Sequence, residues 1–578
     1  MTETVLEEII KGVFADNWLI PAISVAITLT AIKWIYGKRI PKYFKISSIV
    51  LTTFIGALIV THFFPWNLYP DLQRIRKSLL ILLVIGIVSA AVVLLYVYIK
   101  IERQLRMVIK NTAFDGNKIN AWRELQHIKV TTLTPWQKKT YDKRRLYLRV
   151  FLGNMCGATK EVEKFRDDKS FYHYMKAIML YFKGKHRDEL TEVKLAEDYC
   201  NGDTDPFLHF QIIGNRGVGY VCAGEYSLAN DCFERAIAFG KDTGLISPEL
   251  WVDMYYNYAF NKTRLRPEIS IMDCLDLIED VKKHIDIEDP KQYIAYRNIV
   301  IEILRQKKAD NAQINKVINE DFIYLVHANL TDKERCVLEA TTARMVCTGR
   351  LNPSAVIEYM SKDIMLFLRL PMPEKYKCVK EINYLFKNLR GSITEQNCKL
   401  KETAHKYMVE QAMEDFEKYR ASLPAEAVHE ICYCLKEKAG LRKYKPEQYD
   451  WGKFLKDMRS AQMLYMENEL LADAALCALH IIDEALAEPN IDANFKPLHV
   501  DAMKSALQEV EEILPELMEH PILNEIYLRL AHYCLVMNDI QKGREYYEKL
   551  QKLGKFSIDH FAPWLRKKIL YCKYIYAG

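Results

Sequence analysis

Long uncharged runs near the beginning of the chain are the clearest feature of its hydrophobic pattern. Residues 79–99 form a run of twenty-one residues without a charge, between Lys77 and Lys100. A helix of that length would span roughly 30 Å, the thickness of a bilayer's hydrocarbon core. Two further apolar runs precede it. The pattern therefore predicts a membrane anchor in residues 1–99, with three transmembrane helices near 18–36, 46–64 and 79–99.

The charges between these runs predict the side of the membrane on which the rest of the chain lies. The 37–45 loop carries four Lys/Arg and no acid, and a strongly basic segment follows residue 99. Because Lys and Arg concentrate in cytoplasmic loops, we expect a multi-pass protein of the cytoplasmic membrane with its large C-terminal region in the cytoplasm. Arg74, Arg76 and Lys77 in the second loop oppose this topology. A two-span alternative, with residues 18–36 on the membrane surface, stays open.

The predicted spans contain one feature that goes beyond anchoring. Gly86 and Ala90 are four residues apart on the third span, a spacing at which small residues let two transmembrane helices approach closely. Two interpretations remain, namely packing among the three spans and a homo-oligomer formed through this helix–helix contact. No Asp or Glu occurs within a span, which argues against a pore or a transporter.

The segment directly after the spans is strongly basic. Residues 100–149 contain thirteen Lys/Arg and four Asp/Glu, a net charge of +9 in a chain whose total is +6. Trp and Tyr residues lie among these charges, as expected for a neck that contacts anionic lipid headgroups. We predict membrane lipids as the partner rather than nucleic acid, and a solvated helix face is the alternative. The candidate lipid-contacting residues are Arg103, Arg106, Lys138, Lys139, Arg144 and Arg145.

Helical periodicity continues through most of the remaining chain. Apolar residues recur at i, i+3, i+4 and i+7 in segments of about 15 residues, which Gly, Pro and Asp residues separate. Residues 454–487 are predicted as one continuous helical run, and 130–133 is a short strand candidate. The predicted fold class is all-α.

One pair of predicted helices carries a specific pattern. Around a turn at Gly224, small and aromatic residues occur at fixed offsets, at Gly217, Tyr220, Ala229, Phe233 and Ala236. Small residues let two helices touch, and the aromatic rings fill the space that they leave. The pattern resembles the tetratricopeptide repeat (TPR) family, whose helix pairs stack into an α-solenoid.

Degenerate copies of this pattern turn at Gly184 and at residues 538–539. The first has Glu189 where a small residue belongs, and the second has Cys534 in place of the aromatic residue. The resemblance implies TPR-like repeats at 150–245, a degenerate helical-hairpin array at 246–520, and a C-terminal hairpin with a capping helix at 521–578.

The TPR resemblance also implies which side chains would face a ligand, namely those on the first helix of each pair. The candidate partner-binding residues of this concave face are Phe171, Tyr174, Tyr181, Gln211, Val218, Val221 and His532. Most of them are apolar or aromatic. We expect this face either to bind an apolar peptide or helix, or to be filled by the chain's own neighbouring helices.

The sequence offers no motif for catalysis, cofactor binding or metal binding. Its fourteen cysteines include no C-x-x-C spacing and favour a reducing compartment. We therefore expect no enzyme, and predict a membrane-anchored scaffold whose cytosolic solenoid recruits or senses a protein or peptide. The alternative is a sensor–effector, as in bacterial stress or phage defence, in which ligand capture by the solenoid perturbs the membrane.

Overall fold

The computed structural model describes most of the chain beyond residue 118. The described ranges are 118–307, 364–388, 395–444, 449–517 and 522–553, with short gaps at 204, 245 and within 488–496, together with most of 92–105 and scattered residues elsewhere. The expected spans lie outside these ranges apart from the end of the third, and so do Gly86, Ala90 and Arg106. Within the described part, no helix combines the length and apolar character needed to cross a bilayer.

The described residues are folded into helices, and they contain no β-strand, so the all-α prediction is confirmed for this part of the chain. The chain divides into two compact units, Met1–Leu148 and Arg149–Gly578. The first unit contains a helix at 95–105, α5 (Lys118–His127), the short 3-10 helix η3 (Val130–Thr132) and most of α6 (Pro135–Phe151).

The strand expected at 130–133 is wrong, because these residues form η3. The Leu133 N–H donates to the Val130 carbonyl at 3.3 Å, which closes a tight turn. A strand needs a neighbouring strand to satisfy its backbone groups, and the described residues provide none.

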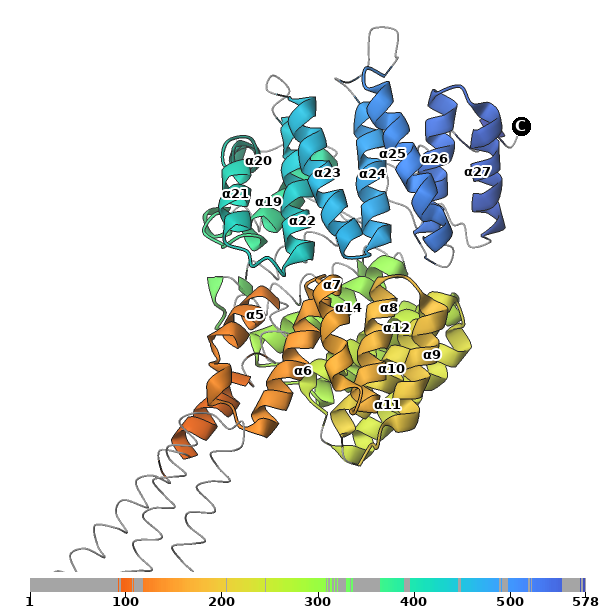
Figure 1. The fold of residues 1–578 in the computed structure, drawn as a ribbon. Helices are drawn as coiled ribbons and strands as arrows, with labels where there is room; N and C mark the ends of the chain where they lie inside the picture. Colours follow the sequence, from red (N-terminus) through yellow and green to blue (C-terminus); the bar gives the residue numbers. More distant parts are fainter. Residues whose placement is uncertain are drawn as a thin grey trace, which may run out of the picture. The chain divides into compact units, whose positions relative to one another are not determined.

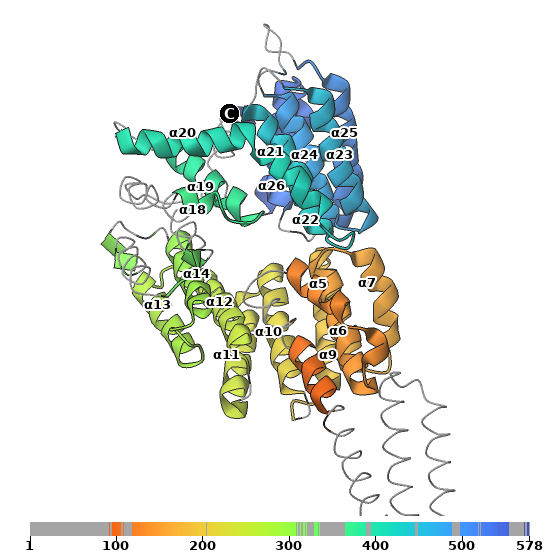
Figure 2. The same ribbon diagram turned by 90° about the vertical axis from the view of Figure 1, so that its left-hand side faces the viewer.

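The second unit is an array of helices, most of which form consecutive antiparallel pairs (Figures 1 and 2). Its first part contains α7 (Met155–Val162), η4 (Glu163–Phe165), α8 (Lys169–Phe182), α9 (His186–Tyr199), α10 (Pro206–Ala223), α11 (Tyr226–Thr243), α12 (Pro248–Leu265), α13 (Ile271–Glu279), η5 (Asp280–Lys283) and α14 (Pro290–Gln306). Its second part contains α18 (Ile364–Phe367), α19 (Glu374–Asn388), α20 (Glu395–Glu410), α21 (Ala412–Ala421), α22 (Val428–Leu441), η6 (Arg442–Tyr444), α23 (Trp451–Glu467), α24 (Leu471–Ala485), α25 (Val500–Ile513), η8 (Leu514–Leu517), α26 (Leu523–Val536) and α27 (Ile540–Lys552).

The α10–α11 pair shows why the sequence forms a helical hairpin. The Asp205 side chain caps α10 by accepting from the Leu208 N–H at 3.1 Å. Gly224 ends the helix with a φ of 80°, a left-handed conformation that favours glycine. A Cβ at Gly217 would lie 2.7 Å from the fully buried Phe233 ring, so the glycine lets α10 and α11 approach closely. The turn and packing residues of the TPR-like pattern therefore lie where the sequence predicts them.

The two degenerate pairs also turn at the expected residues. Gly184 between α8 and α9 has a φ of 73°, and Asn538 between α26 and α27 has a φ of 58°. Glu189, in the position of a small residue, is 3% exposed. Its carboxylate oxygen Oε2 is hydrogen-bonded to His186 Nδ1 at 2.9 Å. Gly219 of α10 accommodates this larger side chain, because a Cβ there would lie 3.0 Å from Glu189 Oε1.

The continuous helix expected at 454–487 is wrong, since α23 and α24 are two helices that pack against each other. The chain reverses at residues 468–470, where Glu469 has a φ of 56°. No glycine or proline marks this turn. The Asn468 side chain stabilises it by donating to the Leu464 carbonyl at 2.9 Å.

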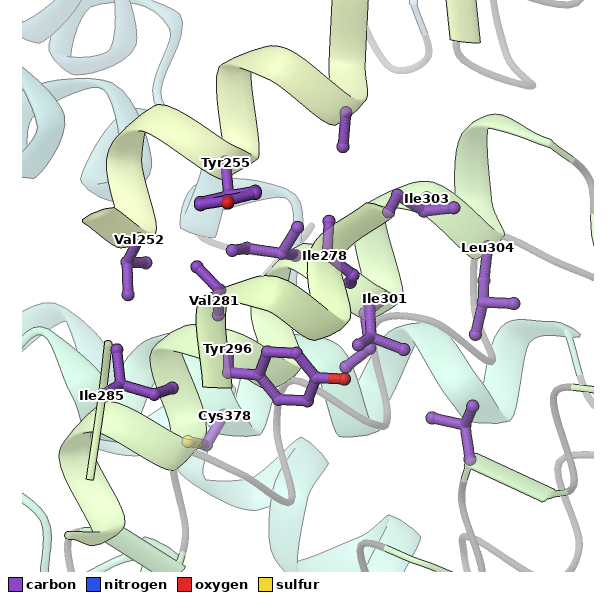
Figure 3. Close-up of a cluster of buried hydrophobic side chains, with 14 of the residues drawn as sticks. Val252, Tyr255, Ile278, Val281, Ile285, Tyr296, Ile301, Ile303, Leu304 and Cys378 are labelled. Carbon is purple, nitrogen blue, oxygen red and sulfur yellow. The ribbon is translucent and has the colours of Figure 1, made fainter. Parts of the chain in front are cut away.

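A large cluster of buried hydrophobic side chains joins α10–α14 to α19–α22. Figure 3 shows part of it, where Tyr255 of α12, Ile278 of α13 and Tyr296 of α14 lie near Cys378 of α19. The Tyr296 hydroxyl donates to Glu279 Oε1 at 2.9 Å, so its polar end is satisfied at the edge of the cluster. The two parts of the second unit therefore share one core.

Turns near the start of the second unit also contact residues far along the chain. The His429 N–H donates to the Leu152 carbonyl at 3.0 Å. The Lys183 ammonium lies 2.6 Å from a Glu469 carboxylate oxygen, across 286 residues of sequence. Repeats of a solenoid usually contact only their neighbours. In this unit the first hairpins additionally contact the turns near α22–α26, and we call these the long-range turn contacts.

Candidate partner-binding surface

The first helices of three successive pairs, α8, α10 and α12, lie beside one another, since α10 packs against both of the others. The Asn215 amide of α10 donates to the Tyr174 hydroxyl of α8 at 2.9 Å, which fixes the register of these two helices. Met254 of α12 fits against α10 at Gly214, where a Cβ would lie 2.5 Å from its methyl group. Small residues and one amide therefore hold three parallel first helices together.

Exposed aromatic side chains gather on the side that these helices share. Tyr181 of α8 is 37% exposed and Tyr256 of α12 is 38% exposed. The Tyr256 ring stacks on the Phe260 ring at a centroid distance of 6.5 Å, and the Arg264 guanidinium lies 4.6 Å from the Phe260 centroid. We define the aromatic patch as Tyr181, Cys222, Tyr256, Phe260 and Arg264.

Burial, together with neighbouring groups, keeps two members of the aromatic patch neutral. Burial of its hydroxyl, together with Cys222, Glu189 and Tyr256, raises the pKa of Tyr181 to about 12. Burial and the Glu189 carboxylate also raise the pKa of Cys222 to about 12, whereas the Arg264 charge opposes this shift. The Cys222 thiol is therefore protonated at neutral pH and is a poor nucleophile. The patch offers neutral aromatic surface with one cation at its edge.

Glu189 lies behind the aromatic patch, in the core between α9 and α10. Burial raises the pKa of its carboxyl group, and the hydrogen bond with His186 opposes that rise. The His186 ring is itself 4% exposed. This pair is a structural contact within the first turn of α9.

The residues predicted to face a partner have different environments. Phe171 and Tyr174 are buried, at 7% and 3% exposure, and the Phe171 ring packs on Phe165 at 5.0 Å. The half-buried residues are Gln211, Val218, Val221 and His532. Val218 and Val221 pack against the hydrophobic cluster of α10–α22, and His532 lies on α26. Tyr181 is the member of this set that contributes to the aromatic patch.

Sequence reasoning missed the contribution of α12. The α12–α13 pair lacks the small and aromatic offsets of the TPR pattern, so the resemblance implies no ligand-facing positions on it. The spacing of Tyr256, Phe260 and Arg264 at i, i+4 and i+8 was the available signal, because these positions share one face of a helix.

The predicted lipid-contacting residues fall into two groups in the first unit and at its boundary. Arg103, Lys138 and Lys139 are exposed. Arg144 and Arg145 are half-buried, and the Arg145 guanidinium lies 5.9 Å from the Tyr141 ring centroid and 3.9 Å from Asp142. The Arg145 side chain is therefore used in part for packing within its own helix.

The described residues hold no group of three or more His, Cys, Asp or Glu side chains that could bind a metal ion. The cysteines in the described part form no disulfide.

The fold and the surface together define a class, the all-α helical-repeat proteins with TPR-like hairpins. No protein-family model matches this chain, and no curated protein matches it in sequence. Among solved structures, a Rap protein complexed with competence and sporulation factor aligns at 12% identity, covering 73% of this chain and 99% of that one, with a TM-score of 0.28. A monomeric mutant of IFIT1 with Gppp-AAAA aligns at 12% identity, covering 72% and 90%, with a TM-score of 0.23. The class assignment rests on the hairpins described above.

Proposed function

We propose that this chain is a protein-interaction module whose aromatic patch binds a peptide or helix of a partner protein. The observation that carries the proposal is the gathering of exposed Tyr181 and Tyr256 on one side of α8, α10 and α12. Tyr and Arg are the residues most often found at the energetic centre of protein interfaces, since they bury large area and keep a polar end. The Arg264 guanidinium adds a donor for a carboxylate or carbonyl at the edge of the patch.

Site-specific photo-crosslinking tests this proposal. A photoreactive phenylalanine analogue at position 256 of the full chain should give a discrete protein adduct in cells, which mass spectrometry identifies. The matched control is the same analogue at Tyr199 of α9, which is 49% exposed and lies outside the patch. Identical adducts at both positions, or none at 256, would contradict the proposal.

Binding of the partner so identified should then depend on the patch. Tyr256→Ala removes an exposed ring and should weaken binding by about 2 kcal/mol, or roughly thirtyfold in Kd. Tyr199→Ala should leave Kd within about twofold, since surface positions outside an interface contribute little. Isothermal titration with the full chain measures both values, and equal losses would show that the patch is not the binding surface.

We further propose that the N-terminal segment holds this module at the cytoplasmic membrane, with the second unit in the cytoplasm. The support is the apolar run at 79–99 and the exposure of its described end, where Val92, Leu95, Tyr96 and Ile99 are 59%, 58%, 65% and 54% exposed. Contiguous apolar side chains on a surface mark a contact with membrane or protein. The full chain should stay in the membrane pellet after carbonate washing, and its release into the supernatant would contradict this location.

A further inference from the structure

The start of α6 is fixed against the helix at 95–105, within the first unit. Gln137 is completely buried, and its amide donates to Glu102 Oε1 at 3.2 Å and to the Tyr98 carbonyl at 3.5 Å. The Thr134 hydroxyl accepts from the Gln137 N–H at 3.2 Å, and the Gln137 side chain accepts from the Thr134 N–H at the same distance. The reciprocal cap fixes the first turn of α6. The Gln137 contacts with Glu102 and Tyr98 hold that turn beside the end of the apolar run.

The residues on either side of Gln137 point outward at this level. Trp136 is 63% exposed, an unusual state for the largest apolar side chain, and Lys138 and Lys139 are exposed next to it. Val130 of η3 is 39% exposed. We name this set, Val130, Trp136, Lys138 and Lys139, the neck patch.

The helix at 95–105, which contacts the start of α6, also exposes aromatic and apolar side chains. Tyr98 and Ile99 are 41% and 54% exposed, and both belong to the end of the apolar run. The Gln137 side chain lies between this helix and the neck patch, because its amide donates to the Tyr98 backbone carbonyl. Exposed Trp and Tyr rings with nearby lysines, at the end of a long apolar segment, have the composition of a membrane–water interface.

We propose that the neck patch docks onto the headgroup region of a bilayer that contains anionic lipid. Trp136 would lie at the interface, where an indole finds both an apolar and a polar environment. Lys138 and Lys139 would be attracted to the negative surface, and Val130 would add apolar contact. This inference rests on the proposed membrane location and adds a second contact beyond the transmembrane segment.

The geometry favours a bilayer over nucleic acid as the occupant. A nucleic acid would use the lysines and could stack on Trp136, but it would leave Val130, Tyr98 and Ile99 exposed to water. A bilayer surface covers the charged, aromatic and apolar members together. The fixed position of Gln137 also makes the docking a property of the folded neck rather than of a flexible basic tail.

Tryptophan quenching by brominated lipids tests the docking in the full chain, reconstituted into phosphatidylcholine vesicles with and without phosphatidylglycerol. The chain has eight tryptophans, so the variant Trp136→Phe separates the contribution of one of them. If Trp136 lies in the headgroup region, this variant loses quenchable emission and the quenched fraction falls. If Trp136 lies in water, the variant loses unquenched emission and the quenched fraction rises, which overturns the proposal. Trp451→Phe in α23 is the matched control and should raise the quenched fraction.

The charge requirement is tested with the double variant Lys138→Glu, Lys139→Glu. It should reduce the quenching of Trp136 in vesicles with phosphatidylglycerol and leave it unchanged in phosphatidylcholine alone. Lys399→Glu with Lys401→Glu, at two exposed lysines of α20, is the control and should have no effect. Equal effects of the two pairs would contradict docking through the neck.

Two further outcomes separate this inference from the proposed function. Release of the chain by carbonate would defeat the membrane location itself. Retention in the membrane together with a rise of the quenched fraction for Trp136→Phe would defeat the docking alone. A shift of the Trp136 emission by added RNA, with none by anionic vesicles, would instead identify nucleic acid as the ligand.

Discussion

Gly184 lies at a point where backbone conformation and packing both require glycine. Its φ is 73°, and a Cβ there would lie 2.2 Å from His520 Cδ2, in a segment more than 300 residues away in sequence. Other side chains pay about 1–2 kcal/mol for the left-handed conformation alone. The close approach to an imidazole ring adds a second penalty, because the ring would have to move.

The substitution Gly184→Ala should therefore destabilise the second unit by more than the backbone term. Gly244→Ala is the matched control, since Gly244 has a φ of 61° and a Cβ added there would have no atom within 4 Å. We expect a loss of roughly 1 kcal/mol for Gly244→Ala and a distinctly larger loss for Gly184→Ala. Chemical denaturation of the full chain in detergent measures the free energy of unfolding of both variants. Equal losses would show that the close approach to His520 does not affect stability.

Single residues also show what sequence reasoning could and could not recover. Gly184 and Gly224 were predictable as turns, because few other residues adopt a positive φ. Glu189 was recognisable as a misfit in the TPR-like pattern. Its buried partner His186 was not, since the pattern specifies the size of a side chain but not the polar contact that can replace it.

At the scale of elements, one buried ring links the α10–α11 pair to the next pair. Phe233 is fully buried, lies against Gly217, and its centroid is 6.5 Å from that of Tyr258 in α12. It thus contacts its own hairpin and the next one. Removal of the ring would therefore leave a cavity between the two hairpins.

Phe233→Ala should therefore cost about 3–5 kcal/mol, the usual range for emptying a phenylalanine site in a core. Phe207→Ala on α10, where the ring is 44% exposed, should cost less than about 1 kcal/mol. Hydrogen exchange of the α10 and α11 amides should accelerate in the first variant and stay unchanged in the second. Unchanged exchange for Phe233→Ala would mean that the hairpin is held elsewhere.

Element boundaries were predictable where glycine, proline or the TPR-like pattern marks them, as at Gly224 and Asn538. The break between α23 and α24 depends on Asn468 and Glu469. Because residues of these types also occur inside helices, the helical periodicity of the sequence continues across this turn and does not mark it. The aromatic patch was half predictable for a similar reason. Tyr181 followed from a recognisable repeat, whereas Tyr256 and Phe260 lie on a pair without that signature.

At the scale of the whole molecule, the long-range turn contacts include two histidines that face each other. The His186 and His520 ring centroids are 6.2 Å apart, and His520 Nδ1 accepts from the Ile522 N–H at 3.1 Å. Burial, and secondarily the neighbouring His186, lowers the pKa of His520 to about 4, while Asp473 opposes this shift. The folded contact therefore contains a neutral His520.

Stability should consequently fall as the pH falls from about 6.5 to 4. In that window the unfolded chain, with an ordinary histidine pKa near 6.5, binds a proton that the folded His520 does not. The loss is at most about 3 kcal/mol, at about 1.4 kcal/mol per pKa unit, and it is smaller where water reaches the ring. Glu189, whose pKa is raised, contributes in the opposite direction.

Substitution of His520 isolates this term from the other titrating groups. His520→Asn keeps an acceptor near the Ile522 N–H and should flatten the pH dependence of the unfolding temperature between pH 7 and 5. His405→Asn, at an exposed histidine of α20, should leave the wild-type dependence intact. A wild-type slope in His520→Asn would contradict a neutral His520 in the folded state.

The long-range turn contacts can form only late in the synthesis of the chain. Lys183 and Glu469 are separated by 286 residues, which a ribosome adds in about 15–60 s at 5–20 residues per second. Throughout that interval the α8–α9 hairpin exists without the residues that cover its turn. The first hairpins are synthesised early, but their turns gain their native contacts only after the distant residues have been made. Folding of this repeat array therefore cannot be completed hairpin by hairpin in the order of synthesis.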